Sequence, residues 1–289
     1  MQIVYHVGAH GTDHERIART LMRNREELWE HGVEIPAPGR YKGVFGETMK
    51  ALNGGAAPAD VQEMLLDALL DNDSSNRIIL SQSSFLGMPQ RAISPTGLYP
   101  RAPGRMSGLS NLFPDNVVEF VVTVMHPAKL VLEIVKMSNG NYETVMGGVD
   151  PAALSWSPAI RNILQLVPDR DIVVFAQEDL PFIMPEVLHR MVDIDDKAEL
   201  KGELDLLAEI LGPEAFKQFQ QRLAEAEDDS ISTRRNLTEE ALLAAAPSAF
   251  EEIVALPGWS QPLIDELSES YAHDLAEIAA LPGVEFISA

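Results

Sequence analysis

The sequence contains no cysteine among its 289 residues. Disulfide bonds, thiolate catalysis and cysteine-ligated zinc are therefore excluded. No apolar run approaches the ~20 residues that a membrane-spanning helix needs. Met1 leads directly into a strand-like segment, without the basic start of a secretory signal peptide. We therefore expect a globular protein of the cytoplasm.

Basic side chains are also scarce, with 22 Lys and Arg against 44 Asp and Glu, a formal net charge of -22 at pH 7. Such an acidic surface repels nucleic acid and anionic membranes, so we expect neither as a partner. A polyanionic ligand would need a local basic pocket. The expected partners are a small anionic ligand or another protein, and the oligomeric state stays open.

Apolar, strand-like segments alternate with amphipathic helical segments over residues 1–195, with strands near Gln2, Arg77, Val117 and Asp171. This order predicts an α/β fold, with a central, mostly parallel sheet flanked by helices and right-handed crossovers. Helical periodicity dominates residues 196–289, which predicts a helical C-terminal extension packed on the core. The terminal GVEFIS is β-like and predicts either an edge strand or a docked tail.

The first thirty residues read as a strand, a glycine-bearing loop and an amphipathic helix. Thr12 and Glu15 have the spacing of a capping box, in which each side chain accepts from the other's backbone amide. The free amides and the dipole at the start of a helix favour an anion in the preceding loop. We therefore expect an anion-binding geometry around Gly8 to Thr12.

The stretch HVGAHGTDHERIARTLMRNREELWEHGVEIPAPGRY is similar to the opening of bacterial sulfotransferase-like proteins, H-I-G-x-H-K-T-G-T-T followed by N-R-x-x-L, G-V-x-x-P and G-R. The resemblance implies a P-loop-like fold that binds the donor 3′-phosphoadenosine-5′-phosphosulfate. It places the donor loop at Gly8, Ala9, Gly11, Thr12 and Asp13. Gly11 stands where the family has lysine. The acidic residues Asp13 and Glu15 stand at the first and last positions of the family's Gly-Thr-Thr. We expect these carboxylates to repel the donor.

Two later segments also resemble the family. VVEFVVTVMHP matches a strand that ends in arginine, any residue and proline, but Met125 replaces the arginine that binds the donor's 3′-phosphate. His126 and Lys129 are the candidate substitutes, although neither has the bidentate geometry of arginine. FAQEDL is similar to the family's Y-E-D-L, which makes Glu178 a candidate catalytic base; alternatively, Asp179 simply caps the next helix.

The irregular stretch 88–114 contains Arg101 and Arg105, which we expect at the mouth of a pocket; alternatively, they pair with surface carboxylates. Ser81, Ser83 and Ser84 follow the second strand, at the end of a parallel sheet where ligands bind. His6, His10 and His14 are spaced by four, but they fall in a strand, a loop and a helix. We therefore expect no metal site.

Three functions are compatible with this pattern. The spacing of the family's motifs is retained, but the residues that would bind the donor are replaced. This combination favours a non-catalytic binding or interaction protein without a cofactor. The first alternative is an active sulfotransferase with a rebuilt pocket and His10 or Glu178 as base. The second is an enzyme repurposed for another anionic ligand or a metal. Fold alone does not decide among them, because function depends on the site.

Overall fold

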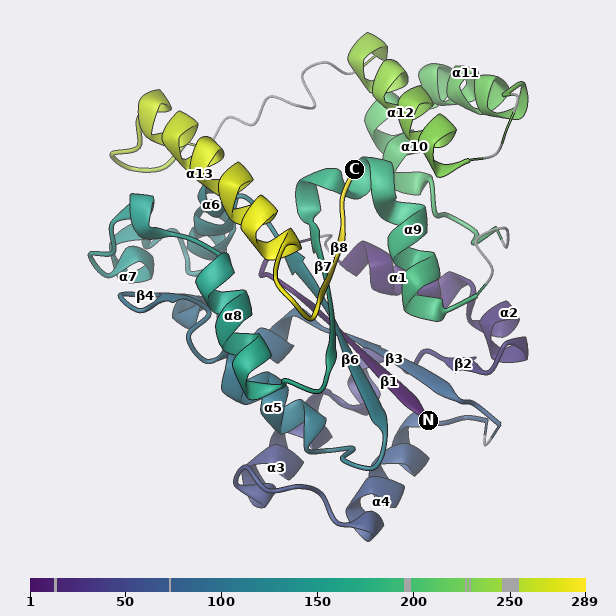
Figure 1. Ribbon diagram of the computed structural model, residues 1–289, viewed down its shortest axis with the longest axis vertical. Helices are drawn as coiled ribbons and strands as arrows, with labels where there is room; N and C mark the ends of the chain where they lie inside the picture. The colour runs from purple at the N-terminus through teal and green to yellow at the C-terminus, as the bar shows by residue number, and fades with distance from the viewer. Residues whose placement is uncertain (13–14, 73, 195–198, 227, 229, 246–254) are drawn as a thin grey trace.

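A six-stranded parallel sheet forms the centre of the computed structural model, which describes residues 1–12, 15–72, 74–194, 199–226, 228, 230–245 and 255–289 (Figure 1). The strand order is β2-β3-β1-β6-β7-β8. Its strands are β1 (Gln2–Gly8), β2 (Val33–Glu34), β3 (Arg77–Ser81), β6 (Val117–Val124), β7 (Asp171–Ala176) and β8 (Val284–Ile287). A separate antiparallel pair consists of β4 (Ile93–Ser94) and β5 (Gly97–Leu98).

Helices flank this sheet on both faces (Figure 1). They are α1 (Arg16–Arg23), α2 (Arg25–Glu30), α3 (Lys42–Leu52), α4 (Ala59–Leu69), α5 (Ala102–Ser110), α6 (Pro127–Met137), α7 (Tyr142–Met146), α8 (Ser157–Leu166), α9 (Leu180–Val192), α10 (Asp205–Leu211), α11 (Pro213–Ala224), α12 (Ile231–Ala245) and α13 (Gln261–Ala279). Short 3₁₀ turns are η2 (Pro38–Arg40), η3 (Ser83–Leu86), η4 (Pro89–Arg91), η5 (Pro151–Ala153) and η6 (Gln177–Asp179). Among the described helices, none is long and apolar enough to cross a membrane.

The predicted α/β fold class is confirmed, and all four predicted strands lie in the sheet. The central strands are apolar on both sides because both faces are covered. Ile3 and Tyr5 of β1 pack into the larger core beneath α3, α4, α5 and α8. Val4 packs into a second core with α1, α2 and α9. Successive side chains of β1 therefore pack alternately against the helices on one face and on the other face of the sheet.

After the neighbouring strands β1 and β3, the chain passes to opposite faces of the sheet. β1 is followed by α1, whose Ile17 and Leu21 pack on the same face as Val4. The path from β3 to β6 runs through α5, whose Met106 packs on the face of Tyr5. In open parallel sheets, a crevice forms outside the carboxyl ends of two strands at such a switch point. The topology thus marks the space above β1 and β3 as the place for a site.

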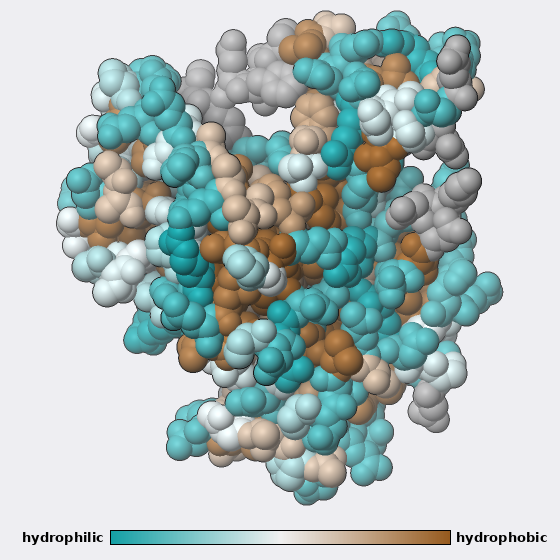
Figure 2. All heavy atoms as spheres, in the orientation of Figure 1, coloured by the Kyte–Doolittle hydropathy of each residue, from teal (hydrophilic) through white to brown (hydrophobic). Residues whose placement is uncertain are grey.

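The C-terminal segment has two parts. Helices α10, α11 and α12 enclose a small core of Leu207, Leu211, Phe219 and Leu242. The chain then returns through α13, and β8 pairs in parallel with β7, so the edge-strand interpretation of GVEFIS is confirmed. Figure 2 shows apolar side chains gathered over this edge of the sheet. The division at 195/196 stays a prediction, but the sheet's last strand lies beyond it.

Three local predictions are wrong. The stretch after Ser138 is rich in asparagine and glycine, which predicts a loop. It nevertheless contains α7, because the Asn141 side chain accepts from the Thr144 amide at 2.9 Å. The stretch from Asp228 to Arg235 likewise predicts a loop between two helical segments, but it is helical from Ile231. No capping box forms at Thr12 and Glu15: Glu15 is left-handed, with φ 63°, and its side chain makes no cap bond.

Candidate functional site

A pocket of about 570 Å³ opens at the switch point, above the carboxyl ends of β1 and β3. We call it the switch-point pocket. Its floor consists of neutral polar residues and glycine from the strand ends and the following loops, namely His6, Gly8, Thr12, Ser81, Gln82 and Ser83. The predicted location of a ligand site beside Ser81 and Ser83 therefore coincides with a real hollow.

The walls of the switch-point pocket come from helices on both faces of the sheet. Apolar atoms are supplied by Ala18 and Met22 of α1, Pro38 of η2 and Met137 of α6. Charged side chains are Glu15, Arg19 of α1 and Lys42 of α3. Among the described residues, no carboxylate forms an ion pair with Arg19 or Lys42. In a chain this acidic, two cations on facing walls make a local site for an anion.

The loop at the end of β1 does not present a row of free amides to the pocket. The amide of Ala9 donates to the Thr123 carbonyl at 2.9 Å, and the amide of Thr12 donates to the Ala9 carbonyl at 3.1 Å. The amide of His10 donates to the Tyr99 hydroxyl at 2.8 Å. A phosphate-binding loop needs such amides for its ligand. This loop uses three of the four amides of residues 9–12 for internal hydrogen bonds.

Gly11 lies against the side chain of Glu133 from α6. Its φ is +90°, and a Cβ added there would lie 2.6 Å from both Cβ and Cγ of Glu133. The Glu133 carboxylate is held by Lys136 at 2.6 Å. A third carboxylate, which the sequence did not reveal as part of the loop, therefore adjoins the position of the family's lysine. Asp13 lies outside the described residues.

His10 is buried and stacks on Tyr99, with ring centroids 5.6 Å apart. The Tyr99 hydroxyl accepts from the His10 amide, so its proton is donated to Nδ1 at 2.9 Å. Nε2–H then donates to the Gly87 carbonyl at 3.2 Å. Burial lowers the pKa of His10, which favours this neutral form. Both nitrogens are engaged and His10 does not line the pocket, which argues against it as a catalytic base.

Glu178 joins the ends of β6 and β7 to α13. Its Oε1 accepts from the His126 amide at 2.8 Å, and its Oε2 accepts from the Tyr271 hydroxyl at 3.1 Å. Burial raises the pKa of Glu178, while nearby Lys129 and these hydrogen bonds oppose the shift. The ring of His126 caps α6 by accepting from the Ala128 amide at 3.1 Å. The structure thus brings Glu178, His126 and Lys129 close together, but none of them lines the switch-point pocket.

Neither arginine predicted at the pocket mouth lines this pocket. Arg105 of α5 donates to the carbonyls of Phe85 at 2.7 Å and Ser84 at 3.0 Å. It therefore positions η3, the turn that carries Ser83. Arg101 is exposed at the start of α5. The alternative was that Arg101 and Arg105 pair with surface carboxylates. Among the described residues, neither arginine forms such an ion pair. Asp179 occupies the first position before α9 without a side-chain cap bond, so its predicted capping role is wrong.

His6 is buried at the base of the pocket. Its Nδ1 lies 2.8 Å from the Ser81 hydroxyl and its Nε2 lies 3.0 Å from the Thr123 hydroxyl. Among the described residues, no group of three His, Cys, Asp or Glu side chains is placed to hold a metal ion. His14 lies outside them. The ring of His6 therefore fixes the ends of three neighbouring strands.

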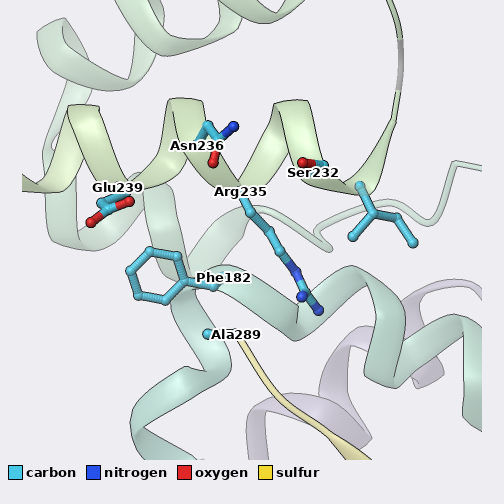
Figure 3. Close-up of a pocket in the computed structure, with 7 residues that line it drawn as sticks. Phe182, Ser232, Arg235, Asn236, Glu239 and Ala289 are labelled. Carbon is cyan, nitrogen blue, oxygen red and sulfur yellow. The ribbon is translucent and has the colours of Figure 1, made fainter.

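A second pocket, of about 640 Å³, lies between α9 and α12. Figure 3 shows Ser232, Arg235, Asn236 and Glu239 along α12, with Phe182 and Ala289 opposite them. The Arg235 Nε donates to Glu186 at 2.9 Å, and Arg234 also pairs with this carboxylate. The Arg235 cation is thus already in an ion pair, whereas Arg19 and Lys42 of the switch-point pocket form none with a described carboxylate. We therefore take the switch-point pocket as the candidate site.

No family model and no curated protein matches the sequence. Among solved structures, the chain is similar to a sulfotransferase from Alicyclobacillus acidocaldarius, with 10% sequence identity and a TM-score of 0.40. The match covers 80% of this chain and 98% of that one. The fold and the site together define an α/β protein with a parallel sheet and a switch-point pocket.

Proposed function

We propose that this chain is a binding protein for a small anionic ligand, which Arg19 and Lys42 hold in the switch-point pocket. The observation that carries the proposal is the pair of cations on facing walls, without an ion pair among the described residues, in a chain of net charge -22. A charge-assisted hydrogen bond contributes ~1.5 to 3 kcal/mol. Two of them are sufficient to select an anion over a neutral molecule.

We further propose that the ligand is not the phosphosulfate donor and that the chain does not transfer sulfuryl groups. The internal bonds of residues 9–12, together with Glu133 behind Gly11, support this part. Met125 supports it too, because it is fully buried where the family's arginine would meet the 3′-phosphate. Transfer of this kind depends on positioning and charge stabilisation, which these residues do not supply.

Calorimetry with 3′-phosphoadenosine-5′-phosphate, the desulfated donor, tests the second part. We expect no saturable heat at micromolar concentrations. A single saturable site with a dissociation constant of about 1 μM, roughly -8 kcal/mol, would contradict the proposal. It would favour the alternative of a sulfotransferase that has rebuilt its donor site with other residues.

A thermal-shift screen of short carboxylates, phosphate esters and sulfate esters tests the first part. We expect at least one anion to raise the melting temperature. Arg19→Ala and Lys42→Ala should each weaken that binding by about tenfold to a hundredfold. Lys50→Ala is the matched control, because Lys50 is exposed on the same helix as Lys42 but does not line the pocket. Binding that is insensitive to both pocket variants would contradict the proposal.

A further inference from the structure

We infer that the ligand of the switch-point pocket is a free amphiphilic monoanion, a single carboxylate or sulfonate head on an apolar alkyl or aryl body. This inference rests on the proposed function and adds the chemistry of the rest of the ligand. It follows from the three parts of the pocket, namely the floor, the walls and the charges.

Most polar side chains of the floor have already made hydrogen bonds, whereas Gln82 Oε1 is buried without a partner among the described residues. His6 bonds to the hydroxyls of Ser81 and Thr123. The Thr12 hydroxyl donates to the Ala9 carbonyl at 2.7 Å, and the Gln82 amide bonds to Ser84. A sugar, polyol or nucleoside is selected by protein groups that pair with its own donors and acceptors. With the Gln82 Oε1 acceptor and the exposed Ser83 hydroxyl as its main remaining polar groups, the floor offers few such partners, so it does not favour a ligand with many hydroxyls.

The walls of the pocket are apolar and adaptable. Ala18 and Met22 are four residues apart, so they lie on one face of α1 beside Arg19. Met137, at the end of α6, is 44% exposed although it is apolar. Pro38 completes this apolar lining. Methionine side chains fit ligands of irregular shape because they have three rotatable bonds and a polarisable sulfur. Such walls favour a ligand with a substantial apolar body.

The charges favour a single anionic group. Among the described lining residues, Arg19 and Lys42 oppose the one carboxylate of Glu15, which leaves a net charge of +1. The carboxylate of Glu133 behind Gly11 further disfavours a polyanion. The same headgroup chemistry occurs in anionic membranes, but their surface repels a chain of net charge -22. The free amphiphile is therefore the ligand that fits.

Calorimetry with butanoate, hexanoate, octanoate and decanoate, each below its micelle concentration, tests the inference on the full chain. We expect one site and an affinity that rises about fourfold per methylene until the chain fills the pocket. Octan-1-ol should bind at least tenfold more weakly than octanoate, since it lacks the charge that Arg19 and Lys42 recognise. Vesicles of phosphatidylglycerol should not bind the protein in a flotation assay.

Variants separate the two ends of the ligand. Met22→Gln and Met137→Gln should reduce the gain per methylene, whereas Arg19→Ala should weaken all chain lengths by the same factor. Met64→Gln is the matched control, because Met64 is 51% exposed on α4 and does not line the pocket. All these positions are exposed or half-buried, and an unchanged unfolding midpoint verifies that each variant is folded.

Two results would overturn the inference and leave the proposed function standing. The first is binding of phosphate or sulfate esters that depends on Arg19 and Lys42, with carboxylates showing no dependence on chain length. The second is binding to vesicles but not to free carboxylates. If no anion of either panel binds in a manner sensitive to Arg19 and Lys42, both the inference and the proposed function are wrong.

Discussion

At the amino end of the sheet, Glu119 of β6 is buried between Arg77 of β3, at 3.6 Å, and Arg190 of α9, at 3.1 Å. At the carboxyl end, the cations Arg19 and Lys42 line an open pocket, and no ion pair joins them to a described carboxylate. The half-buried carboxylate at this end, Glu178, accepts from the His126 amide and the Tyr271 hydroxyl, with Lys129 nearby. Charged side chains at the amino end of the sheet are therefore held in a network of ion pairs, whereas the two cations at the carboxyl end are exposed in a pocket.

The network around Glu119 is part of the fold, whereas Arg19 and Lys42 are placed for binding. Burial raises the pKa of Glu119 although two guanidiniums oppose the shift, so this network does not stabilise the fold more than apolar packing would. Its members nevertheless depend on one another, because removing Glu119 leaves the buried Arg77 with only the exposed carboxylate of Asp193, at 3.6 Å, as an ionic partner among the described residues. Exposed cations at a pocket rim remain hydrated and cost little. They are available to a ligand for the same reason.

The largest effect is expected for Glu119→Gln, which removes the carboxylate between the buried Arg77 and the half-buried Arg190. We expect the free energy of unfolding to fall by about 3 to 5 kcal/mol, measured by chemical denaturation. Glu285→Gln is the control, because Glu285 also pairs with Arg190 but is 50% exposed. It should cost less than about 1 kcal/mol. Equal losses in the two variants would show that burial does not distinguish the charges at this end.

A loss at most comparable with that of Glu119→Gln is expected for Gly11→Lys, which places a lysine in the loop at the carboxyl end of the sheet. The left-handed φ costs ~1 to 2 kcal/mol, and contact with Glu133 costs ~1 to 3 kcal/mol. We therefore expect a loss of about 2 to 5 kcal/mol, without binding of 3′-phosphoadenosine-5′-phosphate. Gly43→Lys is the control, since nothing lies within 4 Å of its Cβ in α3. A stable Gly11→Lys variant that binds this nucleotide would contradict the account of the loop.

The smallest effect is expected for Glu178→Gln, and its sign is opposite to that of Glu119→Gln. Because burial raises the pKa of Glu178 in the folded state, folding favours its protonated form. That stability is present below the unfolded pKa and is lost as the pH rises through the folded pKa. Glutamine is neutral at every pH and keeps an acceptor for the His126 amide. We expect a higher melting temperature for the variant at neutral pH, and a gap that closes in acid.

A scan of melting temperature from about pH 4 to about pH 8 checks this prediction. A variant that melts below the wild type at neutral pH would show that the ionised carboxylate is well stabilised by its amide, its hydroxyl and Lys129. The two ends of the sheet would then differ less than the geometry indicates.

Much of the fold was predictable from the sequence because it depends on local patterns. The runs around Ile78 and Val121 identify buried strands, and Pro127 marks the start of the helix after β6. The short edge strand β2 was missed because two residues, Val33 and Glu34, show no periodicity. Helix α7 was missed because its cap, Asn141, sits in a stretch whose asparagines and glycines also suit a loop.

The site was less predictable, because its residues come from different layers. Arg19 and Lys42 look like ordinary exposed residues of amphipathic helices, and no sequence signal distinguishes them from Lys50. Arg101 and Arg105 were preferred because an irregular loop is the more usual place for binding residues.

The sequence by itself determined the strand-and-helix order, the absence of cysteine chemistry, the acidic charge and the presence of a glycine at position 11. These are properties of residue type and of spacing over a few positions. Only the tertiary structure decided that Tyr99 engages His10 from 89 residues away, that Glu133 lies behind Gly11, and that Glu178 supports α6. Such contacts depend on strand order and register, which bring together side chains that no local period relates.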